Sequence, residues 1–141
     1  MVKFVLGPKG SGKTKWLIDG ANHDKATGHG NIVFIDTDDS HIFSLDHSVR
    51  LINARNFGIE NSKEMYGFLC GIISRDYDIE KIYIDGMYDI IDFNLDTFTI
   101  LVNRLKEISK EYEVEFLLGM NKTTEDLPEE FRADSVELEA Q

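Results

Sequence analysis

The sequence predicts an α/β fold: a three-layer sandwich in which helices cover both faces of a mainly parallel central sheet of about five strands. Three observations lead to this prediction. Short apolar runs typical of buried strands alternate with stretches of helical period along the chain. A glycine-rich turn joins the first run to the first helix. Several later runs end in a polar residue, and right-handed crossovers bring such strand ends to one edge of a sheet.

Each strand is expected where β-branched and aromatic residues gather between turn residues. The predicted strands span residues 2–6, 31–36, 49–53, 81–85 and 114–120. The predicted helices run from about Lys13 to Gly20–Ala21, over 62–75, over 94–112 and, beginning at Pro128, over 127–131. In the helix over 62–75, apolar residues recur at i, i+3, i+4, i+7 and i+8 behind a polar cap at Asn61 or Ser62. This apolar stripe indicates packing against the sheet.

The length of 141 residues predicts one domain. Residues 124–141 carry −6 of the net charge of −11, so we expect a folded domain over 1–123 and a partly disordered acidic extension over 124–141. The acidic balance disfavours binding to nucleic acids and to anionic membranes. Because the chain has no apolar run long enough to cross a bilayer and has a single cysteine, Cys70, the cytoplasm is the expected compartment.

The turn after the first predicted strand carries the pattern G-x-x-x-x-G-K-[ST], which is typical of loops that bind phosphate. It comprises Gly7, Pro8, Lys9, Gly10, Ser11, Gly12, Lys13 and Thr14, with Lys15 directly after it. The glycines permit backbone turns in which successive N–H groups form an anion-binding nest, and the following helix adds its positive end. Lys13 is expected to reach the terminal phosphates of a nucleotide, and the Thr14 hydroxyl to bind Mg²⁺. The alternative is a glycine-rich turn without a ligand.

Carboxylates are expected at the same edge of the sheet. Asp85 closes an apolar strand, which is the position of a second Mg²⁺ ligand, and the alternative is an aspartate that caps a turn. Asp36, Asp38 and Asp39 follow or end the second predicted strand and are candidates for the group that orients water. The alternative for each of these three is an ordinary loop aspartate.

Gly7 to Thr14 together with Ile82 to Asp85 resembles the P-loop NTPase superfamily. Asn121 closes the last predicted strand, where many such ATPases keep a polar sensor of the γ-phosphate, so the chain is similar to the RecA-like ATPase branch. The compact layout also resembles small bacterial P-loop proteins grouped with twitching-motility ATPases. Gly86 stands where many relatives have a glutamate that activates water, so the resemblance implies a base from elsewhere in the chain.

The resemblance implies an ATP- and Mg²⁺-binding protein that hydrolyses ATP slowly, with Lys13 and either Asp36 or Asp38 in catalysis. GTP is not expected, because Thr124 replaces the aspartate of the guanine-reading pattern N-K-x-D. Two alternatives stay open: a nucleotide-binding regulator without turnover, and a small-molecule kinase. The five arginines are scattered rather than gathered into a lid, and any of them could act on a second copy of the chain or on a protein partner.

Overall fold

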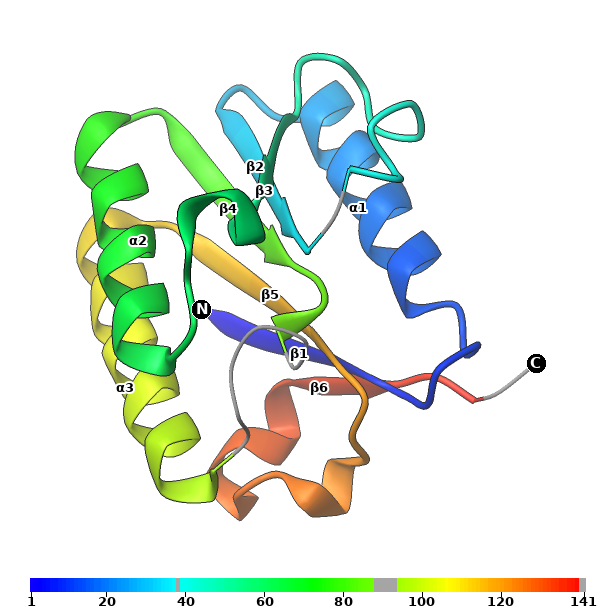
Figure 1. Cartoon of the computed structure of the whole chain (residues 1–141), viewed down its shortest axis with the longest axis vertical. Helices are drawn as coiled ribbons and strands as arrows, with labels where there is room; N and C mark the ends of the chain where they lie inside the picture. The colour runs from blue at the N-terminus through cyan, green and yellow to red at the C-terminus, as the bar shows by residue number, and fades with distance from the viewer. Residues whose placement is uncertain (38, 88–93, 140–141) are drawn as a thin grey trace.

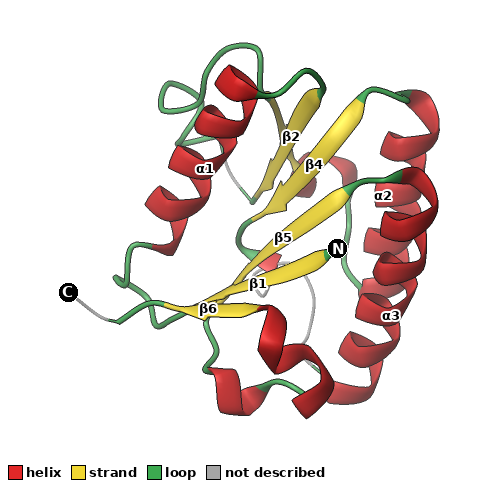
Figure 2. Ribbon diagram, turned by 180° about the vertical axis from the view of Figure 1, so that it is seen from behind, coloured by secondary structure: helices red, strands yellow, loops and turns green. Residues whose placement is uncertain are grey.

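The structure is a computed structural model that describes residues 1–37, 39–87 and 94–139. Within them, six parallel strands form one sheet in the order β3-β2-β4-β5-β1-β6, and helices cover both of its faces (Figure 1 and Figure 2). The predicted α/β class with a mainly parallel sheet is therefore confirmed. The sheet has one strand more than the five that were expected from the sequence.

The strands are β1 (Val2–Leu6), β2 (Asn31–Asp36), β3 (Arg50–Asn53), β4 (Ile79–Ile84), β5 (Glu115–Met120) and β6 (Ser135–Glu137). The α-helices of the described residues are α1 (Lys13–Thr27), α2 (Ser62–Arg75) and α3 (Leu95–Tyr112), and shorter 3₁₀ helices span Ala54–Phe57, Thr124–Asp126 and Glu129–Asp134. The five predicted strands and the three long helices form close to their predicted bounds, with the end of α1 as the exception.

α1 continues past its predicted end at Gly20–Ala21 and stops at Thr27, so that part of the prediction is wrong. Gly20 packs against the sheet instead of ending the helix. A Cβ at Gly20 would lie 3.1 Å from the hydroxyl of Tyr83 on β4, and Ala21 is fully buried. Small side chains at these two positions let α1 lie close to the strands, where its burial outweighs the low helix propensity of glycine.

Residues 124–139 belong to the same sheet and core as the rest of the chain. β6 pairs with β1, and Leu127 and Phe131 are 1% and 0% exposed. The Phe131 ring stacks on that of Phe4 with 5.7 Å between the centroids. The boundary at residue 123 was predicted from the acidic composition of this segment. That composition does not reveal the two apolar residues, Leu127 and Phe131, that anchor it in the core. Their burial orders the segment while most of its carboxylates stay at the surface.

Two apolar clusters hold the layers together. On one face, α2 and α3 pack on inward side chains of the strands such as Phe4 and Phe116. On the opposite face, α1 and the segment after β2 pack on side chains such as Phe34, Tyr83 and Leu117. Neighbours along a strand belong to different clusters because their side chains alternate between the faces. With both faces covered, the parallel strands end together at one open edge of the sheet, beside the start of α1 (Figure 1).

Candidate functional site

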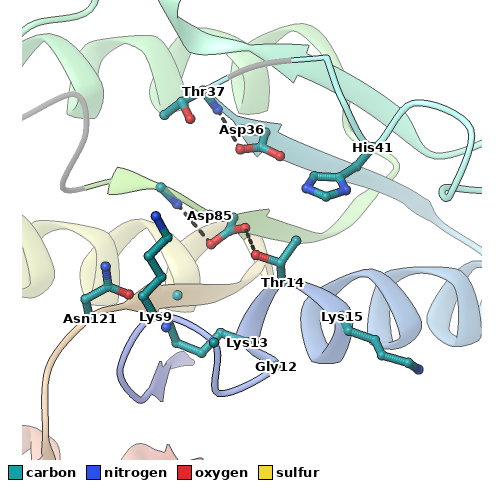
Figure 3. A pocket seen from close by; sticks show the side chains of 13 residues that line it. Lys9, Gly12, Lys13, Thr14, Lys15, Asp36, Thr37, His41, Asp85 and Asn121 are labelled. Carbon is teal, nitrogen blue, oxygen red and sulfur yellow. Dashed lines mark hydrogen bonds between the residues drawn. The ribbon is translucent and has the colours of Figure 1, made fainter. Parts of the chain in front are cut away.

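A pocket of about 520 Å³ opens at this edge of the sheet (Figure 3). One wall is the turn after β1 and the start of α1, with Lys9, Gly10, Gly12, Lys13, Thr14 and Lys15. The opposite wall comes from the ends of β2, β4 and β5 and from the segment that follows β2, with Asp36, Thr37, His41, Asp85, Gly86, Gly119 and Asn121. The structure therefore brings the predicted phosphate loop, the predicted Mg²⁺ ligands and the predicted sensor into one cavity.

The turn after β1 has the backbone that its glycines predict. Gly10 and Gly12 have φ angles of 85° and 89°, in the left-handed region that side chains with a Cβ rarely adopt. Gly12 directly precedes α1, a helix of 15 residues, so the unpaired N–H groups of the first helical turn lie at the pocket. Together with the helix dipole, this arrangement favours an anion at the end of α1.

Lys13 supplies positive charge within this turn. Its side chain is only 8% exposed, and its ammonium donates a hydrogen bond to the carbonyl oxygen of Pro8 at 3.0 Å. Burial lowers the pKa of Lys13 from its ordinary value, and the negative charge of Asp85 raises it in part. The Pro8 carbonyl thus holds the ammonium against the loop, and an anion in the pocket would offer it a stronger partner.

Thr14 and Asp85 meet across the pocket. The Thr14 hydroxyl donates to Oδ2 of Asp85 at 2.7 Å, although the two residues are 71 positions apart in the chain. The other carboxylate oxygen, Oδ1, accepts a hydrogen bond from the N–H of Gly86 at 3.0 Å. A hydroxyl and a carboxylate in contact offer adjacent oxygen ligands to a hard cation such as Mg²⁺.

The end of β2 contributes the candidates for a water-orienting group. Asp36 is 4% exposed, lines the pocket and accepts a hydrogen bond on Oδ1 from the N–H of Thr37 at 2.7 Å. Asp38 lies outside the described residues. Asp39 is exposed, and its carbonyl accepts a hydrogen bond from the N–H of Ile42 in the following turn. Of these three predicted candidates, Asp36 is the one that the described structure places on the wall of the pocket.

Some residues of the loop line the pocket, whereas Gly7, Pro8 and Ser11 support the loop from the side away from the pocket. Pro8 turns its carbonyl toward Lys13 and also accepts the N–H of Ser11 at 3.1 Å. Ser11 is 2% exposed and packs against Gly7, where a Cβ would lie 2.6 Å from the Ser11 hydroxyl. Gly7, Pro8 and Ser11 therefore shape the turn from beneath. At the outer rim, Lys15 pairs with Asp19 at 2.6 Å.

Sequence reasoning missed four residues of the pocket wall: Thr37, His41, Gly86 and Gly119. His41 belongs to the segment after β2, which turns its ring toward the pocket (Figure 3). Gly119 interrupts the apolar run of β5. An isolated glycine in a strand is a signal of close approach by another group, and that signal could have identified it.

Among residues 1–37, 39–87 and 94–139, no three His, Cys, Asp or Glu side chains gather closely enough to hold a metal ion by themselves. None of the helices in that part of the chain is long and apolar enough to cross a membrane. A scan against models of protein families found no match, and a search of curated proteins found none either.

Proposed function

We propose that this chain binds ATP together with Mg²⁺ in the pocket at the carboxyl edge of the sheet, and that it hydrolyses ATP slowly. One observation carries the proposal. The Thr14 hydroxyl lies 2.7 Å from the Asp85 carboxylate, directly beside a glycine turn that leads into a helix and holds a buried lysine. An anion site and a cation site are thus adjacent, which is the arrangement that a metal-bound polyphosphate requires.

The residues present fit a triphosphate. The left-handed turns at Gly10 and Gly12 and the start of α1 supply N–H groups, and Lys13 supplies a full charge. The cavity of about 520 Å³ is within the usual range for small-molecule sites. Lys9 adds a second ammonium at the mouth of the pocket on a protein whose net charge is −11, so local attraction opposes the overall repulsion of an anion.

The residues present also fit Mg²⁺. This ion commonly keeps several waters and takes one or two protein oxygens plus phosphate oxygens. Thr14 and Asp85 match that requirement, whereas a site built wholly from protein ligands would need the larger cluster that the described residues do not form. Held by Thr14 and Asp85, Mg²⁺ would neutralise negative charge that develops on the phosphates.

Each residue then has a role in phosphoryl transfer to water. Lys13 stabilises negative charge on the transferred phosphoryl group, while the backbone of the loop holds the other phosphates in place. Asn121 directly follows β5, which lies between β1 and β4, and its amide can donate to a terminal phosphate oxygen. Asp36, on the opposite wall, orients the attacking water. These three side chains come from α1, from β2 and from the residue after β5, so the reaction depends on the assembled sheet edge.

A second candidate is a nucleotide-binding regulator without turnover. Gly86 follows Asp85, so the strand that carries the metal ligand offers no neighbouring carboxylate to activate water. The nucleotide would then act by stabilising the ordered loop, and exchange or release would take the place of hydrolysis.

Binding and turnover are separable in one set of measurements. Trp16 is the chain's single tryptophan, is 38% exposed and lies two residues after Thr14, so its fluorescence can report occupation of the loop. We expect ATP to bind with Mg²⁺, and a ligand at 100 times its Kd to add about 2.7 kcal/mol of stability. Lys13→Ala should lose most of this effect, while Lys63→Ala, an exposed lysine of α2, should retain it.

Steady-state phosphate release at saturating ATP and Mg²⁺ then decides between the two candidates. Release by the native chain above that of Lys13→Ala supports the ATPase, and equal release with binding intact supports the regulator. No binding of ATP or ADP, with or without Mg²⁺, would contradict both.

A further inference from the structure

We infer that Gly119 is a positioning residue, whose missing side chain lets Thr14 reach the carboxylate of Asp85 across β5. The inference rests on the proposed function only for its effect on Mg²⁺. The phosphate loop follows β1, Asp85 follows β4, and β5 lies between these two strands.

The order of the strands creates a gap that side chains must span. Neighbouring strands lie about 4.8 Å apart, so the ends of β1 and β4 are separated by roughly twice that distance. The Thr14 hydroxyl nevertheless lies 2.7 Å from Oδ2 of Asp85. The two side chains therefore meet above the backbone of β5, on the face of the sheet that α1 covers.

The register of β5 puts Gly119 directly beneath this contact. Gly119 is level with Val5 of β1, and the preceding Leu118 is level with Ile84, the residue before Asp85. Leu117 belongs to the apolar cluster under α1, so two residues further along the strand a side chain at position 119 would point to the same face. That face is where Thr14 and Asp85 meet.

A Cβ at position 119 has no room there. It would lie 2.7 Å from Cδ1 of Leu17 and 3.1 Å from Oδ1 of Asp85. Leu17 is fully buried in the cluster under α1 and can move only by disturbing that packing. The carboxylate of Asp85 is at the pocket and is held by two hydrogen bonds, one to Gly86 and one to Thr14. An alanine at position 119 therefore displaces Leu17, Asp85 or both.

Displacement of Asp85 affects the cation site and leaves the phosphate loop in place. Gly10, Gly12 and Lys13 form the anion site, and none of the three is among the nearest contacts of position 119. We therefore expect Gly119→Ala to separate the two halves of the site: nucleotide binding without Mg²⁺ persists, and the additional affinity that Mg²⁺ provides declines. A general loss of folding would reduce both together.

The test compares Gly119→Ala with Gly71→Ala, a glycine of α2 at which an added Cβ meets nothing within 4 Å. Dissociation constants of ATP are measured by Trp16 fluorescence in excess Mg²⁺ and in EDTA, together with the melting temperature of the free protein. We expect the affinity gain from Mg²⁺ to fall about tenfold in Gly119→Ala, with the Kd in EDTA unchanged, because groups that orient a metal ligand have effects of this size. Gly71→Ala should match the native chain in both dissociation constants, and its melting temperature should be slightly higher because alanine favours a helix interior over glycine.

A crystal structure of the free Gly119→Ala variant provides a readout that needs neither ATP nor Mg²⁺. The separation of the Thr14 hydroxyl and Asp85 Oδ2 should exceed the usual limit of an O–H···O hydrogen bond, about 3.0 Å. An intact contact in that structure, or an undiminished gain from Mg²⁺, would overturn the inference. If the native chain binds no nucleotide, the proposed function fails, while the crystal structure still decides the role of Gly119.

A double variant guards against misfolding of the single one. Leu17→Val removes the Cδ1 atom that lies nearest to the added Cβ, while the contact of that Cβ with Asp85 stays. Gly119→Ala with Leu17→Val should therefore fold and still show the reduced gain from Mg²⁺. Full recovery of that gain in the double variant would assign the effect to packing under α1 and would also contradict the inference.

Discussion

At the scale of single residues, the candidate site depends on side chains that are buried but remain polar. Lys13, Asp36 and Thr37 are each at most 8% exposed. Burying such groups lowers stability unless they have partners, so positions like these are usually retained for function. The carbonyl of Pro8 is a partner for Lys13, and the N–H of Thr37 is a partner for Asp36. Two predictions follow from the individual side chains.

The first concerns Lys13 and pH. Burial lowers the pKa of Lys13 below its value of 10.5 in the unfolded chain. Below the lowered pKa, Lys13 is protonated in both the unfolded and the folded chain. The buried charge then destabilises the folded chain to its full extent. As pH rises through the lowered pKa toward 10.5, the unfolded chain binds more protons and this destabilisation diminishes. Lys13→Met should therefore raise the melting temperature of the free protein at pH 7.

The advantage of Lys13→Met should shrink as pH rises toward 10.5, which thermal unfolding at several pH values would show. The same variant should bind ATP roughly 10- to 100-fold more weakly at pH 7, because a hydrogen bond to a charged group is lost. If Lys13→Met is less stable than the native chain at pH 7, the contacts of Lys13 stabilise the fold by more than the burial of its charge destabilises it.

The second prediction concerns Asp85. Asp85→Asn keeps the size of the side chain but removes its charge, so we expect Mg²⁺-dependent binding of ATP to fall about 10- to 100-fold, with little change in EDTA. Isothermal titration calorimetry in both conditions would measure this. Asp96→Asn, an exposed acid in the first turn of α3, is the matched control and should leave both affinities as they are. Equal losses in the two conditions would place Asp85 outside the metal site.

At the scale of elements, caps and apolar stripes account for where the helices begin and which face they bury. The spacing of Asn61 and Glu64 predicts a capping arrangement, and the structure shows it: the Asn61 side chain accepts the N–H of Glu64 at 2.9 Å, and the Glu64 side chain accepts the N–H of Glu60 at 2.8 Å. The stripe behind this cap buries Met65, Leu69 and Ile73. Such features are encoded within one or two helical turns of sequence.

The cap of α2 is testable in isolation. Asn61→Ala should lower the free energy of unfolding by about 1 kcal/mol, because an N–H of the first turn loses its acceptor. Asn61→Asp retains an acceptor and should change stability by much less. Urea unfolding of the two variants and the native chain measures the difference. Equal stability of Asn61→Ala and the native chain would show that packing alone sets the start of α2.

At the scale of the whole molecule, the last segment of the chain supports the first. β6 lies beside β1, and the N–H of Leu138 donates to the carbonyl of Leu6, the residue before the glycine-rich turn, at 2.8 Å. The carbonyl of Leu138 lies close enough to Gly7 that a Cβ there would approach it to 2.7 Å. An acidic segment that looks dispensable from its composition thus packs against the base of the loop.

Phe131 anchors that segment in the core. Its ring lies 5.7 Å from the ring of Phe4 and 6.3 Å from that of Phe98, measured between centroids. Phe131→Ala should lower the free energy of unfolding by about 3–5 kcal/mol, as a large buried aromatic side chain is lost. Phe43→Ala removes a ring that is 99% exposed and should change stability by less than about 0.5 kcal/mol. Chemical denaturation of both variants would compare them, and similar values would contradict the burial of Phe131.

The order of elements, the caps and the chemistry of the turn from Gly7 to Thr14 were determined by the sequence alone. Each depends on residues within a few positions of one another, and the conformations of Gly10 and Gly12 follow from the lack of a Cβ. The prediction that α1 ends at Gly20 was wrong because it rested on the low helix propensity of glycine. In the structure, Gly20 packs against Tyr83 and the helix continues to Thr27.

Only the tertiary structure decided which strand lies beside which. Placing β5 between β1 and β4 brings Gly119 and Asn121 into the pocket, and placing β6 beside β1 turns an expected tail into part of the sheet. The contact between Thr14 and Asp85 joins residues 71 positions apart. Local periodicity shows which face of an element is buried, but the choice among strand orders depends on packing between distant segments, and that free energy is not readable from any one stretch of the chain.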